Sequence, residues 1–133
     1  MNPYYPFIAR RAANLCEHCR APEIAFNFPH EVEHIVPTAH GGTNRDNNLA
    51  LSCHACNLHK SAFLAGYDEI TQADIRLFHP RLDVWDEHFQ FDPVTREKGG
   101  LTAVGRATVA RLRMNAPAQT SARRLWVGWR IFP

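Results

Sequence analysis

Two pairs of cysteines constrain this chain more than any other feature of its sequence. Cys16 and Cys19 form one Cys-x-x-Cys pair, Cys53 and Cys56 form a second, and 33 residues separate the two pairs. Such pairs offer the four thiolates that a tetrahedral zinc ion prefers, with each pair chelating from a single turn. The alternative, four unrelated buried cysteines, is disfavoured by the two matching spacings. The sequence therefore predicts a structural Zn²⁺ site made by these four residues.

Composition limits the number of domains and the compartment. A chain of 133 residues with 45% hydrophobic content suits one compact domain. No apolar run approaches the roughly 20 residues that a membrane-spanning helix needs, and the first six residues lack the layout of a signal peptide. We therefore expect a cytoplasmic protein without a membrane partner, in which reduced thiols bind metal rather than form disulfides.

Charge is unevenly distributed along the chain. Residues 1–95 carry 7 basic and 12 acidic side chains, whereas residues 96–133 carry 8 basic and 1 acidic, for a net charge of +2 overall. Basic side chains that neutralise phosphates supply affinity for nucleic acid without reading its sequence. Solvated helix faces explain the same charges equally well. The predicted phosphate contacts in this segment are Arg106, Arg111 and Arg113.

The residue pattern predicts an α+β fold. The alternation over residues 28–37 indicates a strand, and Gly41 and Gly42 indicate a loop after it. Apolar spacing and capping residues predict helices over residues 7–15, 57–65, 102–114 and 119–129, with Gly66 ending the second and Thr102 capping the third. A helical turn is expected from residue 46. Residues 75–93 are expected to contain a short strand, a turn and a helix.

The segment between the cysteine pairs carries the residues expected for phosphodiester hydrolysis. Cutting such a bond with water requires a cation that neutralises charge in the transition state and a group that takes a proton from the water. The carboxylate of Glu33 suits Mg²⁺ or Mn²⁺, and neutral His34 accepts a proton near physiological pH. Asn48 and Asn57 add amide groups on either side of Cys53.

The order acid-His, Gly-Gly, Asn-Leu, Cys-x-x-Cys-Asn-x-x-Lys resembles the HNH endonucleases that carry a four-cysteine zinc site. The similarity is close over residues 16–60 and extends to about residue 115. It implies a ββα-metal core in which two strands and a helix hold one divalent ion. It also implies that His34 is the general base, that Glu33 and Asn57 are ligands of the catalytic ion, and that Asn48 fixes the loop that orients His34.

Two positions depart from the pattern of the HNH family. The family most often has Asp where this chain has Glu33, and some relatives have a histidine ligand where this chain has Ser61. Two protein ligands would then hold the ion, with water and substrate phosphate completing its shell, as Mg²⁺ tolerates. We expect weak affinity for the free ion.

These features together predict a single domain with two parts. Residues 1–66 are expected to form a zinc-stapled HNH nuclease core, and residues 67–133 an aromatic-rich, then basic, mainly helical extension packed on it. The expected function is a metal-dependent endonuclease acting on nucleic acid, with DNA favoured by the resemblance and a homodimer as one possible assembly. The alternative is a non-catalytic zinc-dependent nucleic-acid-binding module. His59 and Lys60 are expected to meet phosphate, although a solvated helix face explains them almost as well.

Overall fold

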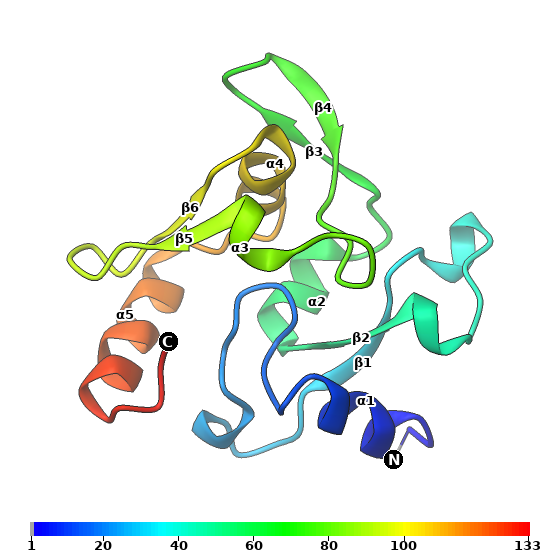
Figure 1. The fold of residues 1–133 in the computed structure, drawn as a ribbon, viewed down its shortest axis with the longest axis horizontal. Coiled ribbons are helices and arrows are strands. Elements are labelled where there is room, and N and C mark those ends of the chain that lie inside the picture. The colour runs from blue at the N-terminus through cyan, green and yellow to red at the C-terminus, as the bar shows by residue number, and fades with distance from the viewer. Residues whose placement is uncertain (1) are drawn as a thin grey trace.

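A two-stranded antiparallel sheet and a following helix carry the segment between the cysteine pairs (Figure 1). The computed structural model describes residues 2–133. In it, β1 (Glu31–His34) pairs with β2 (Leu49–Ser52), placing Glu33 opposite Ala50 and His34 opposite Leu49. The helix α2 (His54–Lys60) begins directly after Cys53. The predicted ββα order is therefore confirmed, with β1 shorter than the expected strand over residues 28–37.

The connection between β1 and β2 is held in shape by a glycine. It contains two short 3-10 turns, Thr38–His40 and Asp46–Asn48, the second in place of the helical turn expected from residue 46. A Cβ atom on Gly42 would lie 1.7 Å from the backbone oxygen of Val36, so no larger residue fits there without moving the chain. The paired glycines therefore mark the loop that the sequence predicted.

The helices on either side of the sheet are shorter than expected. α1 (Tyr5–Arg11) packs Ile8 and Ala9 against Leu49 and Leu51 and ends where Ala13 takes a positive φ of 53°. α2 ends at Lys60, before Ser61 with a φ of 47°. The predicted stop at Gly66 is wrong, because Gly66 lies in the next strand.

The second half of the chain contains two hairpins as well as helices. β3 (Ala65–Asp68) pairs with β4 (Ala73–Arg76), and β5 (Phe89–Phe91) pairs with β6 (Lys98–Gly100). Between and after them lie α3 (Trp85–His88), α4 (Ala103–Arg111) and α5 (Pro117–Gly128). Of these strands, the sequence indicated only one, within residues 75–93. The division of the chain at residue 66 stays a prediction, and β3 crosses it.

α4 is positioned by its cap and by two close approaches to backbone. Thr102 accepts a hydrogen bond from the Gly105 amide at 3.0 Å, as the sequence predicted for a helix cap. A Cβ atom on Gly66 would lie 2.4 Å from the Ala107 oxygen, and one on Gly105 would lie 2.0 Å from the His88 oxygen. Both glycines thus allow α4 to pack directly on β3 and on the end of α3.

The principal core joins the two halves of the chain. All four cysteines are buried in it, together with side chains from the extension: Leu77, Phe78, Phe89, Leu112, Met114, Trp126 and Phe132. Several of these rings meet edge to face, as Phe78 does with Phe89 at a centroid distance of 5.1 Å. The extension therefore packs on the cysteine cluster itself.

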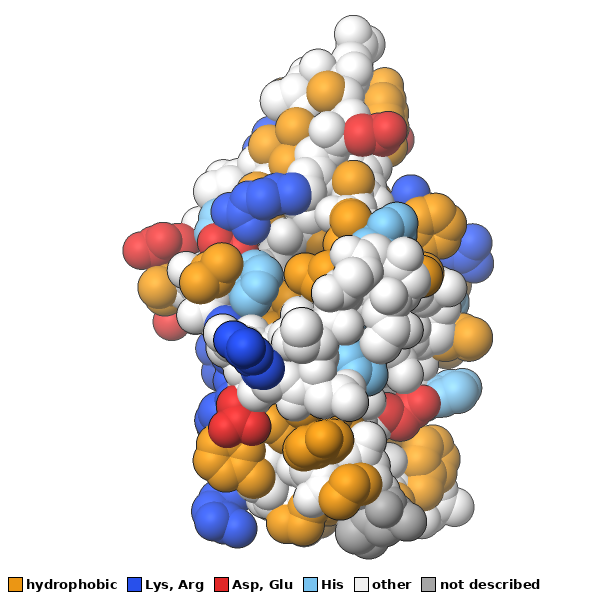
Figure 2. Space-filling model, turned by 90° about the vertical axis from the view of Figure 1, so that its right-hand side faces the viewer, with side chains coloured by type: hydrophobic (Ala, Val, Ile, Leu, Met, Phe, Trp, Pro, Cys, Tyr) orange, Lys and Arg blue, Asp and Glu red, His pale blue; other side chains and the backbone are white. Residues whose placement is uncertain are grey.

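The surface carries no large patch of one kind on the face shown in Figure 2, where apolar, basic, acidic and histidine side chains are interspersed. Among residues 2–133, none of the helices combines the length and the apolar character needed to cross a bilayer.

An ion pair between β3 and α4 gives the fold a testable dependence on pH. Arg106 donates to both oxygens of Asp68 at 2.8 and 3.1 Å, and Asp68 is almost fully buried. The Arg106 guanidinium, followed by the hydrogen bonds from Thr71, holds the pKa of Asp68 well below its ordinary value. The stabilisation is therefore complete above the unfolded pKa of about 3.9 and is lost as the pH falls below it.

We accordingly expect Arg106→Met to lower the midpoint of thermal unfolding by a few degrees at pH 7, and by less as the pH drops below about 4. The exposed Arg113→Met serves as the matched control and should leave the midpoint unchanged at both pH values. A deficit in Arg106→Met that stayed constant with pH would show that the loss comes from packing rather than from the ion pair.

Candidate active site and zinc site

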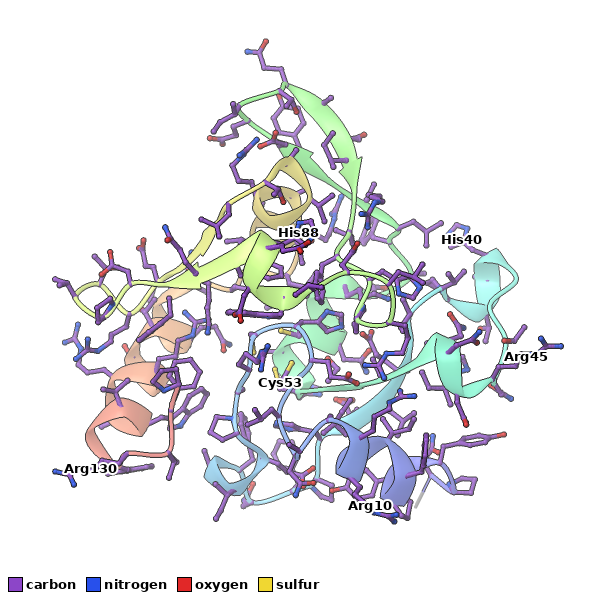
Figure 3. All side chains as sticks on the ribbon, in the orientation of Figure 1. Arg10, His40, Arg45, Cys53, His88 and Arg130 are labelled. Carbon is purple, nitrogen blue, oxygen red and sulfur yellow. The ribbon has the colours of Figure 1, made fainter. Side chains whose placement is uncertain are left out.

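The four cysteines meet in one buried cluster at the centre of the molecule, where Cys53 is labelled in Figure 3. Their sulfur atoms all lie within 4.8 Å of one another, and those of Cys19 and Cys53 are 3.8 Å apart. Tetrahedral zinc with Zn–S bonds of about 2.3 Å requires sulfur atoms about 3.8 Å apart. The donor set and its spacing therefore fit a zinc ion.

Local backbone geometry presents each pair of thiols. The first pair lies in a tight turn in which the Arg20 amide donates to the Cys16 oxygen at 2.8 Å and Arg20 takes a positive φ of 67°. The second pair lies at the start of α2, with Cys53 as its N-cap. Burial raises the pKa of the Cys16 thiol, but hydrogen bonds with the other three thiols outweigh this and hold it well below its ordinary value.

A small pocket brings together three of the residues that the sequence predicted for catalysis. Its volume is about 210 Å³, and its lining includes Glu33 and His34 from β1 and Asn57 from α2. The remaining lining residues are Val32, Pro37, Thr38 and Ser61. Residues of three chemical types, an acid, a histidine and an amide, thus line one opening at the edge of the ββα unit.

His34 is oriented by an asparagine that the sequence analysis did not single out. Its Nε2 lies 2.7 Å from the Oδ1 atom of Asn44. Since an amide oxygen only accepts, Nε2 carries the proton, and Nδ1 of the neutral ring is left with a free lone pair. Asn44 belongs to the Gly-Gly-Thr-Asn loop, and this loop motif was the sequence signal that could have identified it.

Asn48 braces the same loop from inside. Its Oδ1 accepts from the Val36 amide at 2.8 Å, and its Nδ2 donates to the oxygens of Val36 and Thr43 at 3.1 and 2.8 Å. These bonds tie the segment after His34 to the segment before Asn44. The geometry is that expected of a residue that fixes the loop, although Asn48 acts on His34 through Asn44 and not by direct contact.

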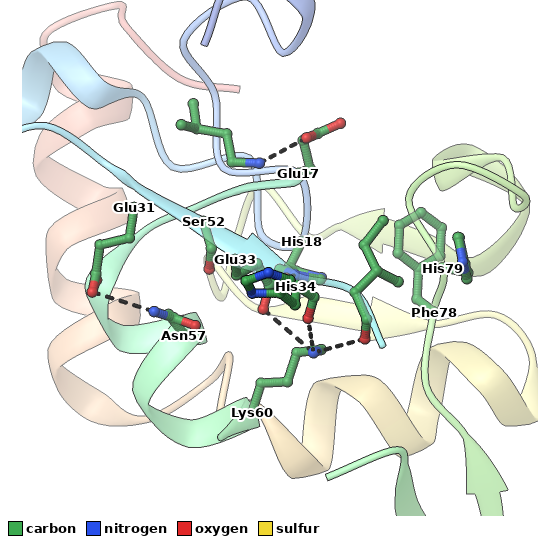
Figure 4. A network of polar contacts seen from close by, with 12 residues as sticks. Glu17, His18, Glu31, Glu33, His34, Ser52, Asn57, Lys60, Phe78 and His79 are labelled. Carbon is green, nitrogen blue, oxygen red and sulfur yellow. Dashed lines mark hydrogen bonds and ion pairs between the residues drawn. The ribbon is translucent and has the colours of Figure 1, made fainter. Parts of the chain in front are cut away.

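Glu33 is deeply buried, at 4% exposure, between the imidazole of His18 and the ammonium of Lys60 (Figure 4). One carboxylate oxygen pairs with Nε2 of His18, and the other lies 3.4 Å from Nζ of Lys60. Burial lowers the pKa of His18, but the Glu33 carboxylate outweighs it and raises that pKa above its ordinary value. His18 lies between Cys16 and Cys19, so the zinc turn itself contacts Glu33.

The structure contradicts the expected role of Lys60. Its side chain is 2% exposed and donates to the backbone oxygens of His34 and Ile35 at 3.1 and 3.0 Å. The Lys60 ammonium is therefore engaged inside the protein and is not presented to solvent. Lys60 instead ties the end of α2 to the end of β1, and the sequence could not show this because its spacing suited a solvated helix end.

Comparison with known proteins places this site in a family. A family model described as HNH endonuclease matches residues 15–63, a range that contains all four cysteines and the residues of the pocket. Residues 15–63 are therefore similar to the HNH endonucleases. No curated protein and no solved structure matches the chain. The HNH family is associated with nuclease or other nucleic-acid-related functions.

A second carboxylate, from Glu31, stands beside the HNH pocket. Its Oε1 lies 3.3 Å from Nδ2 of Asn57, and its Oε2 lies 3.1 Å from Nδ1 of His54. The carboxylate in contact with Asn57 is therefore that of Glu31 and not that of Glu33. Strand alternation could have indicated Glu31 from the sequence, because residues two apart in β1 face the same side of the strand, here toward α2.

The other residues expected to bind phosphate make contacts within the protein. His59 donates from Nδ1 to the Leu112 oxygen at 3.2 Å, and Arg106 is paired with Asp68. Arg111 donates to the Ala65 oxygen at 3.0 Å and stacks over the ring of Phe63 at 3.8 Å. Arg113 is exposed, and among residues 2–133 its side chain has no hydrogen bond or ion pair. Of the predicted residues, Arg113 is the one without a side-chain partner among residues 2–133, and its contact with phosphate stays a prediction.

The cysteine cluster predicts zinc content and a folding defect. Purified protein should contain close to one equivalent of zinc by elemental analysis. Cys53→Ala should lose both the metal and cooperative unfolding, because structural zinc contributes folding free energy on the order of 10 kcal/mol in small zinc peptides. Fully folded, metal-free wild-type protein would contradict the zinc site, and Ser52→Ala is the neighbouring control.

Proposed function

We propose that this protein is a metal-dependent endonuclease that hydrolyses phosphodiester bonds of DNA in the cytoplasm. The observation that carries the proposal is the convergence of Glu33, His34 and Asn57 on one pocket inside the HNH region. Hard oxygen donors such as the Glu33 carboxylate and the Asn57 amide suit Mg²⁺ or Mn²⁺. The bound ion would supply positive charge where the phosphate gains negative charge in the transition state.

In this proposal His34 takes the proton from the attacking water. Its Nε2–H is held by Asn44, which leaves Nδ1 as the proton acceptor in the neutral ring. Protonation of Nδ1 creates an imidazolium that the Asn44 oxygen continues to stabilise through Nε2. Asn48 supports this geometry by fixing the loop, so its side chain is a positioning group.

The surroundings of Glu33 fix its place in the pocket. His18 and Lys60 contact its two oxygens, which compensates the cost of burying a carboxylate. Because both partners are themselves buried, Glu33 has little freedom to turn toward solvent. Coordination of an ion by Glu33 would therefore exchange one of these two contacts for the ion.

DNA is the favoured substrate because of the resemblance to HNH endonucleases, and Arg113 offers an exposed cation for its backbone. One catalytic pocket cuts one strand at a time. A double-strand break would then require two events or two copies of the chain, which is where a homodimer would enter.

The first test is the role of His34. His34→Ala should abolish nicking of supercoiled plasmid in the presence of Mg²⁺ or Mn²⁺, because removal of a general base costs roughly 10²- to 10⁴-fold in rate. The wild type should be inactive in EDTA. Zinc content and the melting curve should stay those of the wild type. His40→Ala, on the exposed loop nearby, is the matched control.

Absence of cutting by the wild type with either ion, on double-stranded, single-stranded and RNA substrates, would contradict the nuclease. Retained zinc-dependent binding to those substrates would then support the alternative, a non-catalytic nucleic-acid-binding module.

The second test separates the two carboxylates of β1. Glu33→Gln should remove Mn²⁺-dependent cleavage at every Mn²⁺ concentration, because it deletes the proposed ligand charge. Glu31→Gln should raise the Mn²⁺ concentration needed by about 10- to 100-fold, the usual effect of a group that orients a ligand. The reverse ranking, in protein of unchanged zinc content, would make Glu31 the ligand and Glu33 a structural partner of His18.

A further inference from the structure

Two cations are buried in the extension without any carboxylate beside them. Lys98 in β6 is 2% exposed, and Arg123 in α5 is 1% exposed. Among the ion pairs of residues 2–133, neither side chain takes part in one. Burying a charge without a counter-charge costs several kcal/mol, so these two positions require an explanation.

The immediate partners of both cations are neutral. The ammonium of Lys98 lies over the rings of Phe132, Trp85 and Phe91 at 4.4, 4.8 and 5.2 Å. The guanidinium of Arg123 donates to the oxygens of Arg96 and Met114 and to Oδ1 of Asn115. Ring faces and carbonyl dipoles attract a cation but supply no full negative charge.

The cysteine cluster lies in the same core as these two cations and would carry negative charge as thiolates. The rings around Lys98 belong to the same core as the four cysteines, and Trp85 donates from Nε1 to the oxygen of His18 in the zinc turn at 2.8 Å. Burial lowers the pKa of Lys98 to about 7, whereas the thiols of Cys19 and Cys16 act in the opposite direction. Burial likewise lowers the pKa of Arg123, and all four thiols oppose it.

The charges balance once zinc is considered. One Zn²⁺ and four thiolates carry a net charge of −2, and a buried dianion is as costly as a buried pair of unpaired cations. We propose that Lys98 and Arg123 are the charge complement of the zinc–tetrathiolate site, so that zinc binding and docking of the extension stabilise each other. The inference rests on the zinc site and is independent of the nuclease proposal.

This assignment also accounts for part of the basic charge of residues 96–133. Lys98 and Arg123 point into the core and cannot meet a phosphate. Two of the eight basic residues in this segment therefore serve the metal site and not a nucleic acid.

The test measures zinc affinity by competition with a chromophoric chelator. Lys98→Met and Arg123→Met keep the length of the side chain but remove its charge, and each should weaken zinc binding about 10- to 100-fold, whereas the exposed Arg124→Met should change it by less than about twofold. Lys98→Arg, which keeps the charge, should retain most of the affinity. Wild-type affinity in both Met variants would overturn the proposal.

A double-mutant cycle separates charge from packing. Replacing one ligand by histidine, as in Cys19→His and in parallel Cys56→His, reduces the charge of the metal site from −2 to −1. The loss of zinc affinity caused by Lys98→Met should be smaller in the histidine-ligand backgrounds than in the four-cysteine protein. An equal loss in all backgrounds would show that Lys98 contributes packing alone and would overturn the charge assignment.

Discussion

The meeting of four cysteine thiols in one buried cluster is the constraint on which the rest of this structure depends. It joins a tight turn before β1 to the first turn of α2, so that the two ends of the ββα unit meet at the four thiols. Leu77, Phe89, Met114 and Trp126 pack in the same core as these cysteines. A short chain thereby gains one continuous core to which both halves of the sequence contribute.

The sequence was most informative where chemistry and spacing act together. Two Cys-x-x-Cys pairs predicted that the four cysteines meet, and the Glu-His, Asn and Cys-x-x-Cys-Asn order predicted the ββα unit. Both arrangements are confirmed. Helix existence was also predicted, including the Thr102 cap, but helix ends were not, because positive-φ residues such as Ala13 and Ser61 ended helices where the composition still allowed them. The β5–β6 hairpin escaped notice since β6 is Lys-Gly-Gly, with little strand character of its own.

Within the site, the sequence indicated which residue types matter but not which partners they choose. Glu33, His34 and Asn57 meet at one pocket, as the motif implied. The contacts of Glu33 with His18, and of His34 with Asn44, depend on the fold of the turn and loop and have no local signature. Lys60 was also misjudged from the sequence. Its position at a helix end suggested that its side chain is exposed to solvent, yet the side chain is buried and its ammonium contacts three oxygen atoms.

The loop between β1 and β2 constrains length more tightly than composition. It is pinned at Gly42, where a side chain has no room, and at Asn48, whose amide holds both of its arms. Between and around these points Thr38, Ala39 and Arg45 face solvent. Substitutions at those exposed positions would leave the spacing of Asn44 and His34 intact, whereas insertion or deletion of one residue would shift the two out of register. Related sequences should therefore differ in this loop by substitutions and not by insertions or deletions.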